Sequence, residues 1–285
     1  MSSSPQSFHK RELPKQLIAM SSEGGKALFR EALAQKSMES FFPLSEQFVT
    51  QSEPSFCALS SLAMVLNALN HDPGKVWKGP WRWISEETLQ CETRDICGHD
   101  LDKVKRNGMD FNEFESLARC HGVRIKSHRS QQTHGSSLSD PDSASAAAAA
   151  LHVFRDTIKA VASSPSADSF VVVNFSRKAL GQTGDGHFSP VGGYHPQRDL
   201  VLVLDVARFK YPPFWVPLED LWASMGRVDE ITGMTRGYFV VSSSLSSLTP
   251  QMQGQEQEQG QEGAHSHTGH SDQCSHGHKQ HQHKH

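Results

Sequence analysis

Four runs rich in β-branched and aromatic residues follow one another in the second half of the chain, and they constrain the fold more than any other feature. They are FVVVNFS (170–176), HFSPVGGYH (187–195), LVLVLDVA (200–207) and GYFVVSS (237–243). Glycine, proline, asparagine and aspartate separate these runs, which is typical of strands joined by turns. In the first half, residues 56–69 carry leucine and valine at spacings of three and four, which predicts a core helix. We therefore predict an α+β fold, with a helical half packed on an antiparallel sheet around one core.

Two stretches of the chain lack the apolar residues that a core requires. The first, 127–150, is rich in serine and ends in five alanines. We expect an insertion loop whose alanines lengthen the following helix, with Ser143 or Ser145 as its N-cap. After Leu248 there is no leucine, isoleucine, valine or aromatic residue, so nothing offsets the entropy of ordering. We predict one folded domain over 10–245 and a disordered Gln/His-rich tail over 246–285.

The charge and cysteine content exclude several classes of protein. Lys and Arg number 28 against 31 Asp and Glu, and a net charge of −3 gives no general attraction to nucleic acid or anionic membranes. No stretch approaches 18 uninterrupted apolar residues, and charges lie where a secretory signal would be apolar. The five cysteines are odd in number and irregularly spaced, which indicates reduced thiols. We expect a cytoplasmic protein with no nucleic-acid or membrane partner.

Cys57 lies where the apolar helix begins, directly after a proline and two further residues. Unpaired backbone N–H groups and the positive end of the helix dipole both favour a thiolate there, which would activate a nucleophile. Considered alone, a free cysteine is more often a small buried apolar residue. Gln51 could hold a developing oxyanion together with the backbone N–H of Cys57. Without other support, an ordinary surface glutamine is the simpler interpretation of Gln51.

His187 opens one predicted strand and Asp205 lies near the end of the next. If the hairpin folds about Pro196, residues 187 and 205 pair across the strands, close enough for the carboxylate to orient the imidazole. The order Gln, Cys, His, Asp, with 130 residues from Cys57 to His187, matches papain-like enzymes, whose last member is usually Asn. The papain signature around the cysteine is absent, so the general arrangement is predicted without the peptidase motif.

The sequence resembles the phytochelatin synthases, a family with a papain-like cysteine-peptidase fold. The resemblance extends from about Leu13 to Val241 and rests on QSEPSFC (51–57), LNALNHDPGKVWKGPWRW (66–83), QTGDGHFSPVGGY (182–194) and LDVARFKYPPFWVPL (204–218). It implies that 10–245 is a catalytic domain with glutathione γ-glutamylcysteinyltransferase activity. In that reaction a cysteine thiolate attacks the Cys–Gly peptide of glutathione, glycine leaves, and the γ-Glu-Cys group passes to a second glutathione or a growing phytochelatin.

On the matching positions, the resemblance makes Cys57 the nucleophile, His187 the base and acid, Asp205 the orienting group and Gln51 the oxyanion donor. It also implies substrate-binding residues. Asp229 would hold the γ-glutamyl ammonium and Arg236 its α-carboxylate. Arg208 and Lys210 lie just past the strand of Asp205, and from this position they could bind a carboxylate of the second substrate. Solvated charges beside a turn remain the alternative interpretation of Asp229 and Arg236.

The family acts on glutathione thiolates of heavy-metal ions, so the resemblance implies Cd²⁺ or Zn²⁺ as activator and as part of the substrate, and no organic cofactor. Two groups of soft ligands are candidates for binding such ions, although unremarkable reduced cysteines and a plain low-complexity tail are the alternatives. They are Cys91, Cys97 and His99 in the core, and Cys274, His276 and His278 in the tail. The implied partners are glutathione and phytochelatin peptides, and a homodimer stays open.

Two other functions are compatible with these residues. The same acyl-enzyme could pass to water, which would make the protein a hydrolase of glutathione or its conjugates. Alternatively, an inert core could carry a His-rich metal-buffering tail. The complete set of Gln51, Cys57, His187 and Asp205 argues against the second alternative.

Overall fold

The computed structural model of the protein describes residues 10–89, 100–130 and 141–243. All of these residues belong to the first of two units into which the chain divides, which ends at Leu248. The predicted domain limits, including the tail over 246–285, therefore stay a prediction.

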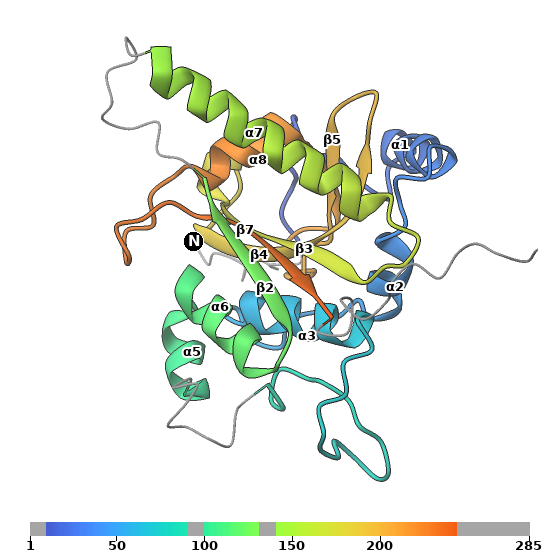
Figure 1. Cartoon of the computed structure of the whole chain (residues 1–285), viewed down its shortest axis with the longest axis vertical. Helices are drawn as coiled ribbons and strands as arrows, with labels where there is room; N and C mark the ends of the chain where they lie inside the picture. The colour runs from blue at the N-terminus through green and yellow to red at the C-terminus, as the bar shows by residue number, and fades with distance from the viewer. Residues whose placement is uncertain (1–9, 90–99, 131–140, 244–285) are drawn as a thin grey trace, which may run out of the picture. The chain divides into compact units, whose positions relative to one another are not determined.

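An antiparallel sheet of seven strands, in the order β1-β6-β5-β4-β3-β7-β2, forms the centre of the described region (Figure 1). The strands are β1 (Ile18–Ala19), β2 (Arg124–Arg129), β3 (Ser169–Ser176), β4 (Gly186–His195), β5 (Leu200–Val203), β6 (Phe214–Pro217) and β7 (Gly237–Ser242). The helices are α1 (Glu23–Ala34), α2 (Phe41–Glu46), α3 (Cys57–Ala68), α5 (Leu101–Asn107), α6 (Phe111–Cys120), α7 (Pro141–Ala162) and α8 (Leu218–Met225), with a 3₁₀ turn, η1 (Lys178–Leu180). The predicted α+β class with an antiparallel sheet is confirmed.

Helices cover both faces of the sheet, so the described residues form two apolar clusters and the predicted single core is wrong. Along β3, Phe170 and Val172 pack into one cluster, while the alternate residues Val171 and Val173 pack into the other. This alternation follows from the two-residue period of a strand, and a strand buried on both faces reads as a continuous apolar run. Figure 1 shows α7 and α8 on one side of the sheet and α3, α5 and α6 on the other.

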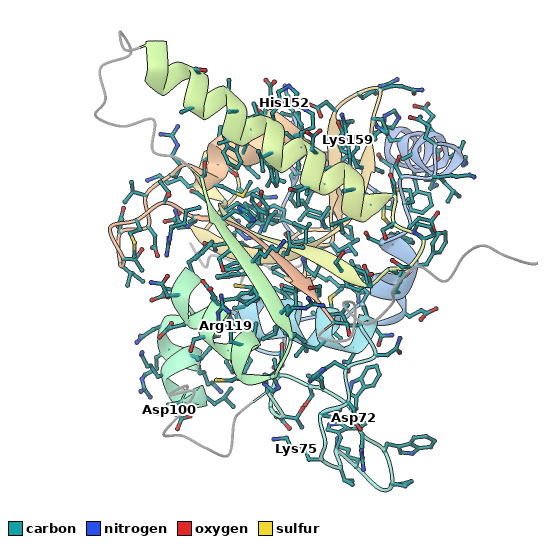
Figure 2. The ribbon with its side chains drawn as sticks, in the orientation of Figure 1. Asp72, Lys75, Asp100, Arg119, His152 and Lys159 are labelled. Carbon is teal, nitrogen blue, oxygen red and sulfur yellow. The ribbon has the colours of Figure 1, made fainter. Side chains whose placement is uncertain are left out.

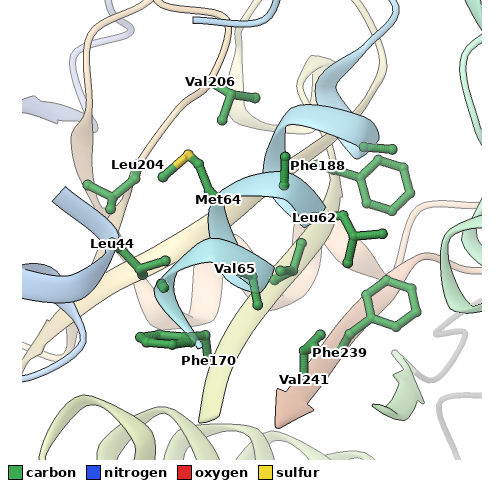
Figure 3. Packing of buried hydrophobic residues seen from close by; sticks show 14 of the residues in the cluster. Leu44, Leu62, Met64, Val65, Phe170, Phe188, Leu204, Val206, Phe239 and Val241 are labelled. Atoms are coloured by element: carbon green, nitrogen blue, oxygen red, sulfur yellow. The ribbon is translucent and has the colours of Figure 1, made fainter. Parts of the chain in front are cut away.

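The helix predicted over 56–69 is confirmed as α3, which is buried along nearly all of its length. Figure 3 shows Leu62, Met64 and Val65 of this helix packed against side chains of the sheet, among them Phe170 and Phe239. Because α3 is enclosed by the sheet and by α6, its first residue, Cys57, has a fixed position against β4.

The insertion predicted over 127–150 is shorter than expected at both ends. β2 continues through Arg129 and pairs with β7, and α7 already begins at Pro141, before the expected N-cap. The alanines do lengthen this helix, as predicted. Phe154, Ile158 and Ala162, at spacings of four, form the buried face of α7.

The opposite face of α7 carries polar residues, and Figure 2 shows His152 and Lys159 on the side away from the sheet. The same view shows Asp72 and Lys75 on the loop that follows α3. Among the described residues, no helix combines the length and the apolar character that crossing a membrane requires.

Candidate active site

Cys57 is the first residue of α3, and its side chain is nearly buried, with 9% of the residue exposed. Burial raises the pKa of the thiol above its ordinary value of 9.0. The backbone N–H groups of Phe188 and Ala58 and the charge of Arg177 act in the opposite direction but are outweighed. The predicted effect of the helix start is thus present, because its N–H group lowers the pKa of the thiol, but the sequence analysis had no measure of the desolvation that outweighs it.

His187 and Asp205 form a buried hydrogen bond, with 2.9 Å between Nε2 and Oδ1. The predicted contact between these two side chains is confirmed, but the predicted pairing is wrong. The turn spans residues 196–199 rather than centring on Pro196, and the register shifts at a bulge between Val191 and Gly193. As a result β5 ends at Val203, and Asp205 approaches the imidazole from beyond the end of that strand.

The hydrogen bonds of His187 fix which ring nitrogen can take a proton. Nε2 lies 2.9 Å from the Asp205 carboxylate and 3.0 Å from the Ser189 hydroxyl. A carboxylate only accepts hydrogen bonds, so Nε2 carries the hydrogen and Nδ1 keeps its lone pair. The Cys57 sulfur lies beside the backbone N–H of Phe188, the residue that follows His187. The Cys57 sulfur therefore lies at the start of β4, the strand that carries His187.

Arg177 is a residue of this site that the sequence analysis missed. Its guanidinium lies 2.9 and 2.8 Å from the two carboxylate oxygens of Asp205 and 2.6 Å from the amide oxygen of Gln182. It is buried and lies over the ring of Tyr211. A charged residue directly after a buried strand, ten residues before His187, is the one signal that could have identified it.

The electrostatics of the site keep His187 neutral and Asp205 ionised. Burial and the charge of Arg177 lower the pKa of His187 to about 4, against the opposing effect of Asp205. Burial alone would raise the pKa of Asp205, but the charges of His187 and Arg177 and its hydrogen bonds hold it at about 2. At neutral pH the buried groups are a thiol, an imidazole and an Arg177–Asp205 ion pair.

Gln51 is buried and lies against the turn that leads into α3. Its backbone N–H donates to Val206, directly after Asp205, at 3.0 Å. Its side-chain amide donates to the carbonyl oxygens of Glu53 and Pro54 at 2.8 and 2.9 Å. Both N–H donors of this amide are thus engaged with backbone carbonyl oxygens. The oxyanion role of Gln51 stays a prediction.

Asp229 and Arg236, predicted as an acid–arginine pair, lie together, with 3.5 Å between carboxylate and guanidinium. Arg236 is buried and makes a closer ion pair, at 2.9 Å, with Asp185, which the sequence analysis did not single out. Asp185 precedes His187 by two residues, so the pair adjoins the start of β4. Arg208 is exposed and lies over the ring of Phe48. The substrate-binding roles of these residues stay predictions.

The predicted metal ligands Cys91, Cys97, His99, Cys274, His276 and His278 lie outside the described residues. Within the described ranges, no group of three or more His, Cys, Asp or Glu side chains could hold a metal ion. Cys57 is a free thiol, whereas Cys120, at the end of α6, is disulfide-bonded. The prediction that all five cysteines are reduced is therefore wrong for Cys120, and it no longer supports a reducing compartment.

The fold and the site together define an α+β protein with a Cys–His–Asp site, in which the cysteine begins a buried helix and the other two residues belong to the sheet region. Residues 8–238 match the family model described as phytochelatin synthase. Because this match covers most of the chain, the protein belongs to the phytochelatin synthase family.

Curated relatives support the same membership. The chain is 45% identical to glutathione gamma-glutamylcysteinyltransferase 3 of Lotus japonicus, over 82% of this chain and 44% of the relative. It is 46% identical to glutathione gamma-glutamylcysteinyltransferase 1 of Triticum aestivum, over 85% and 44%. The corresponding enzyme of Schizosaccharomyces pombe is 41% identical over 82% and 51%. The chain thus spans about half the length, or less, of these relatives.

Proposed function

We propose that this chain is a glutathione γ-glutamylcysteinyltransferase with a papain-like fold, which forms phytochelatins through an acyl-enzyme on Cys57. The observation that carries this proposal is the buried His187–Asp205 hydrogen bond of 2.9 Å, on the strand whose next residue, Phe188, contacts the sulfur of Cys57 through its backbone N–H. A nucleophile, a base and a group that orients the base are the minimum set for covalent acyl transfer.

Acylation begins when the Cys57 sulfur attacks the carbonyl carbon of the Cys–Gly peptide bond of glutathione. The thiol proton passes to Nδ1 of His187, which keeps its lone pair because Nε2–H is directed to Asp205. The imidazolium then protonates the glycine nitrogen as the C–N bond breaks. Glycine leaves, a γ-Glu-Cys thioester remains on Cys57, and His187 is neutral again.

Deacylation follows the same route in reverse, with a different nucleophile. The amine of a second glutathione, or of a phytochelatin peptide, attacks the thioester carbonyl and loses a proton to His187. Cleavage of the C–S bond releases a peptide that is longer by one γ-Glu-Cys unit, and His187 returns the proton to the sulfur. If water attacks instead, the product is free γ-Glu-Cys, so the position of the acceptor amine decides between synthesis and hydrolysis.

Substrate recognition would use the charges near Arg236. The γ-glutamyl end of glutathione carries an ammonium and a carboxylate on the same carbon, which matches an acid beside an arginine. Arg236 forms ion pairs with Asp185 and Asp229. A bound substrate would insert its carboxylate against the guanidinium and its ammonium against Asp229. Arg208 would bind a carboxylate of the second substrate.

Heavy-metal ions enter this proposal as part of the substrate. Cd²⁺ or Zn²⁺ would arrive as a glutathione thiolate complex that masks the substrate thiols, and bond cleavage itself would use only Cys57, His187 and Asp205. The cysteines and histidines of 91–99 and 274–278 would supply additional soft ligands and so raise the local supply of metal. We place the activity in the cytoplasm and leave association with a second copy of the chain as part of the proposal.

The test is to incubate the purified protein with glutathione and Cd²⁺ and to identify the products by mass spectrometry. Formation of (γGlu-Cys)₂-Gly supports the proposal, and formation of γGlu-Cys alone indicates the hydrolase. If neither product forms, the metal-buffering function is the alternative that remains. Cys57→Ser is the control, and product from this variant would contradict the role of Cys57.

A further inference from the structure

Glu86 joins two segments of the active site that are far from it in the sequence. Its carboxylate accepts the backbone N–H of Ser52 at 3.1 and 3.2 Å, and also the hydroxyl of Ser52. The same carboxylate accepts a hydrogen bond from the hydroxyl of Ser60. Glu86 is half-buried, and Ser60 is fully buried in α3. One side chain thus connects the segment that precedes the nucleophile with the helix that carries it.

The two serines that Glu86 binds lie near the two residues that would form an oxyanion site. Ser52 follows Gln51, the predicted oxyanion donor, and Ser60 lies one helical turn beyond Cys57. An oxyanion site between Gln51 and Cys57 consists of a side-chain N–H and a backbone N–H from these two segments. Such a site is effective only when its donors are held in place before the reaction.

Through its bonds to Ser52 and Ser60, Glu86 fixes the distance between the Gln51–Ser52 segment and the first turn of α3. Among the described contacts, Gln51 is held on its other side by Val206, which follows the triad residue Asp205. The backbone of Gln51 and Ser52 is therefore held on one side by Val206, next to Asp205, and on the other side by Glu86. Because the Ser52 N–H and both hydroxyls act as donors, a carboxylate is the group that can accept all three.

We propose that Glu86 is a positioning residue for acylation, which holds the Gln51 segment at the correct distance from the start of α3. This inference rests on the proposed function, because it concerns the oxyanion of that reaction. Glu86 has no contact with the sulfur or the imidazole, so its effect is transmitted through Ser52 and Gln51. Its loss should slow the first chemical step and leave substrate affinity nearly unchanged.

The test measures glycine release in the first turnover of glutathione by Glu86→Ala, with Glu87→Ala as the matched control on an exposed neighbouring residue. We expect the rate of glycine release to fall by about 10- to 100-fold in Glu86→Ala, with KM within about twofold of the unchanged protein. Glu86→Gln, which keeps one acceptor for the Ser52 N–H, should retain an intermediate rate, and Glu87→Ala should be unaffected.

A double-mutant cycle distinguishes positioning from a general loss of structure. If Glu86 acts through Gln51, then adding Glu86→Ala to the Gln51→Ala variant should lower the rate of glycine release by no more than about threefold. Full multiplication of the two effects, or an unchanged rate in Glu86→Ala, would overturn the inference.

Amide hydrogen exchange supplies a readout that does not depend on activity. The amide of Ser52 should exchange faster in Glu86→Ala than in Glu87→Ala, because its acceptor is gone. Unchanged exchange overturns the positioning role. Absence of glycine release from the unmodified protein would instead overturn the proposed function.

Discussion

Arg177 binds the carboxylate of Asp205 directly, with its Nη2 atom 2.9 Å from Oδ1 and 2.8 Å from Oδ2. The residue that orients His187 is thus shared between an imidazole and a guanidinium, and all three groups are buried. A buried carboxylate is stable when it is paired and hydrogen-bonded, and Arg177 provides the counter-ion of Asp205.

Removal of this counter-ion should destabilise the fold. In Arg177→Met the Asp205 carboxylate keeps its buried position without a fixed positive charge, so we expect the free energy of unfolding to fall by about 3 kcal/mol or more. Urea denaturation measures this difference. Lys178→Met, at the exposed neighbouring residue, is the control and should change stability by less than about 0.5 kcal/mol. Equal stability of the two variants would show that the ion pair contributes nothing.

The buried thiol makes a prediction about reactivity. Because burial raises the pKa of Cys57, the ligand-free protein should hold a thiol at neutral pH. The rate of alkylation by iodoacetamide should therefore rise steadily with pH through the neutral range, without reaching a plateau below about pH 8. Mass spectrometry of the Cys57 peptide gives this rate, with Cys57→Ser identifying background modification. A plateau near pH 6 would instead indicate a preformed thiolate–imidazolium pair.

The pKa values of His187 and Asp205 predict loss of stability in acid. Both lie below the ordinary values of 6.5 and 3.8, so the unfolded chain binds protons that the folded protein does not. As pH falls from 6.5 toward about 4, His187 should reduce the free energy of unfolding, and Asp205 should do so from about 3.8 toward 2. The melting temperature as a function of pH tests this expectation. His187→Gln should flatten the upper part of the curve, and an unchanged slope there would contradict the assignment.

The elements that local patterning predicts correctly are those whose burial is continuous along the chain. α3 and β3 are buried at nearly every position and most of their residues are apolar, so their type and extent follow from the sequence. β2 was missed because only Ile125 within it is buried, and its pairing with β7 depends on residues more than a hundred positions away. The capping box of α6, formed by Asp110 and Glu113, is a local signal that could have predicted that helix.

The site shows the same division between local and distant information. Cys57, His187 and Asp205 could be found because their residue types and order match a known arrangement. Glu86 could not, because in the sequence it resembles a solvated charge and its partners Ser52 and Ser60 lie in a distant segment. Arg177 has only the weak signal of its place directly after a buried strand, because its partner Asp205 is also distant in the sequence. The register of the hairpin was wrong for a related reason. A bulge near Gly192, where a Cβ would lie 2.8 Å from the Leu204 side chain, has no sequence signal beyond the glycine itself.

Two adjacent glycines at the start of α1 give the last prediction, because their surroundings differ although their helical positions are similar. A Cβ added at Gly25 would lie 2.0 Å from the carbonyl oxygen of Ala19, which is backbone and cannot move aside. A Cβ at Gly24 would only touch Ile18 at 3.8 Å. Gly25→Ala should therefore lower the free energy of unfolding by about 2 kcal/mol or more. Gly24→Ala should leave it unchanged or raise it by up to about 1 kcal/mol, because alanine favours the helix.

Urea denaturation of the two variants side by side tests the packing of α1 against β1. The carbonyl of Gly25 also accepts a hydrogen bond from the indole of Trp215 in β6, so a shift of the helix would disturb the edge of the sheet as well. A change in the fluorescence of the tryptophans should therefore accompany Gly25→Ala and be absent in Gly24→Ala. If both substitutions have the same effect on stability, the close approach of α1 to the residues that precede it is wrong.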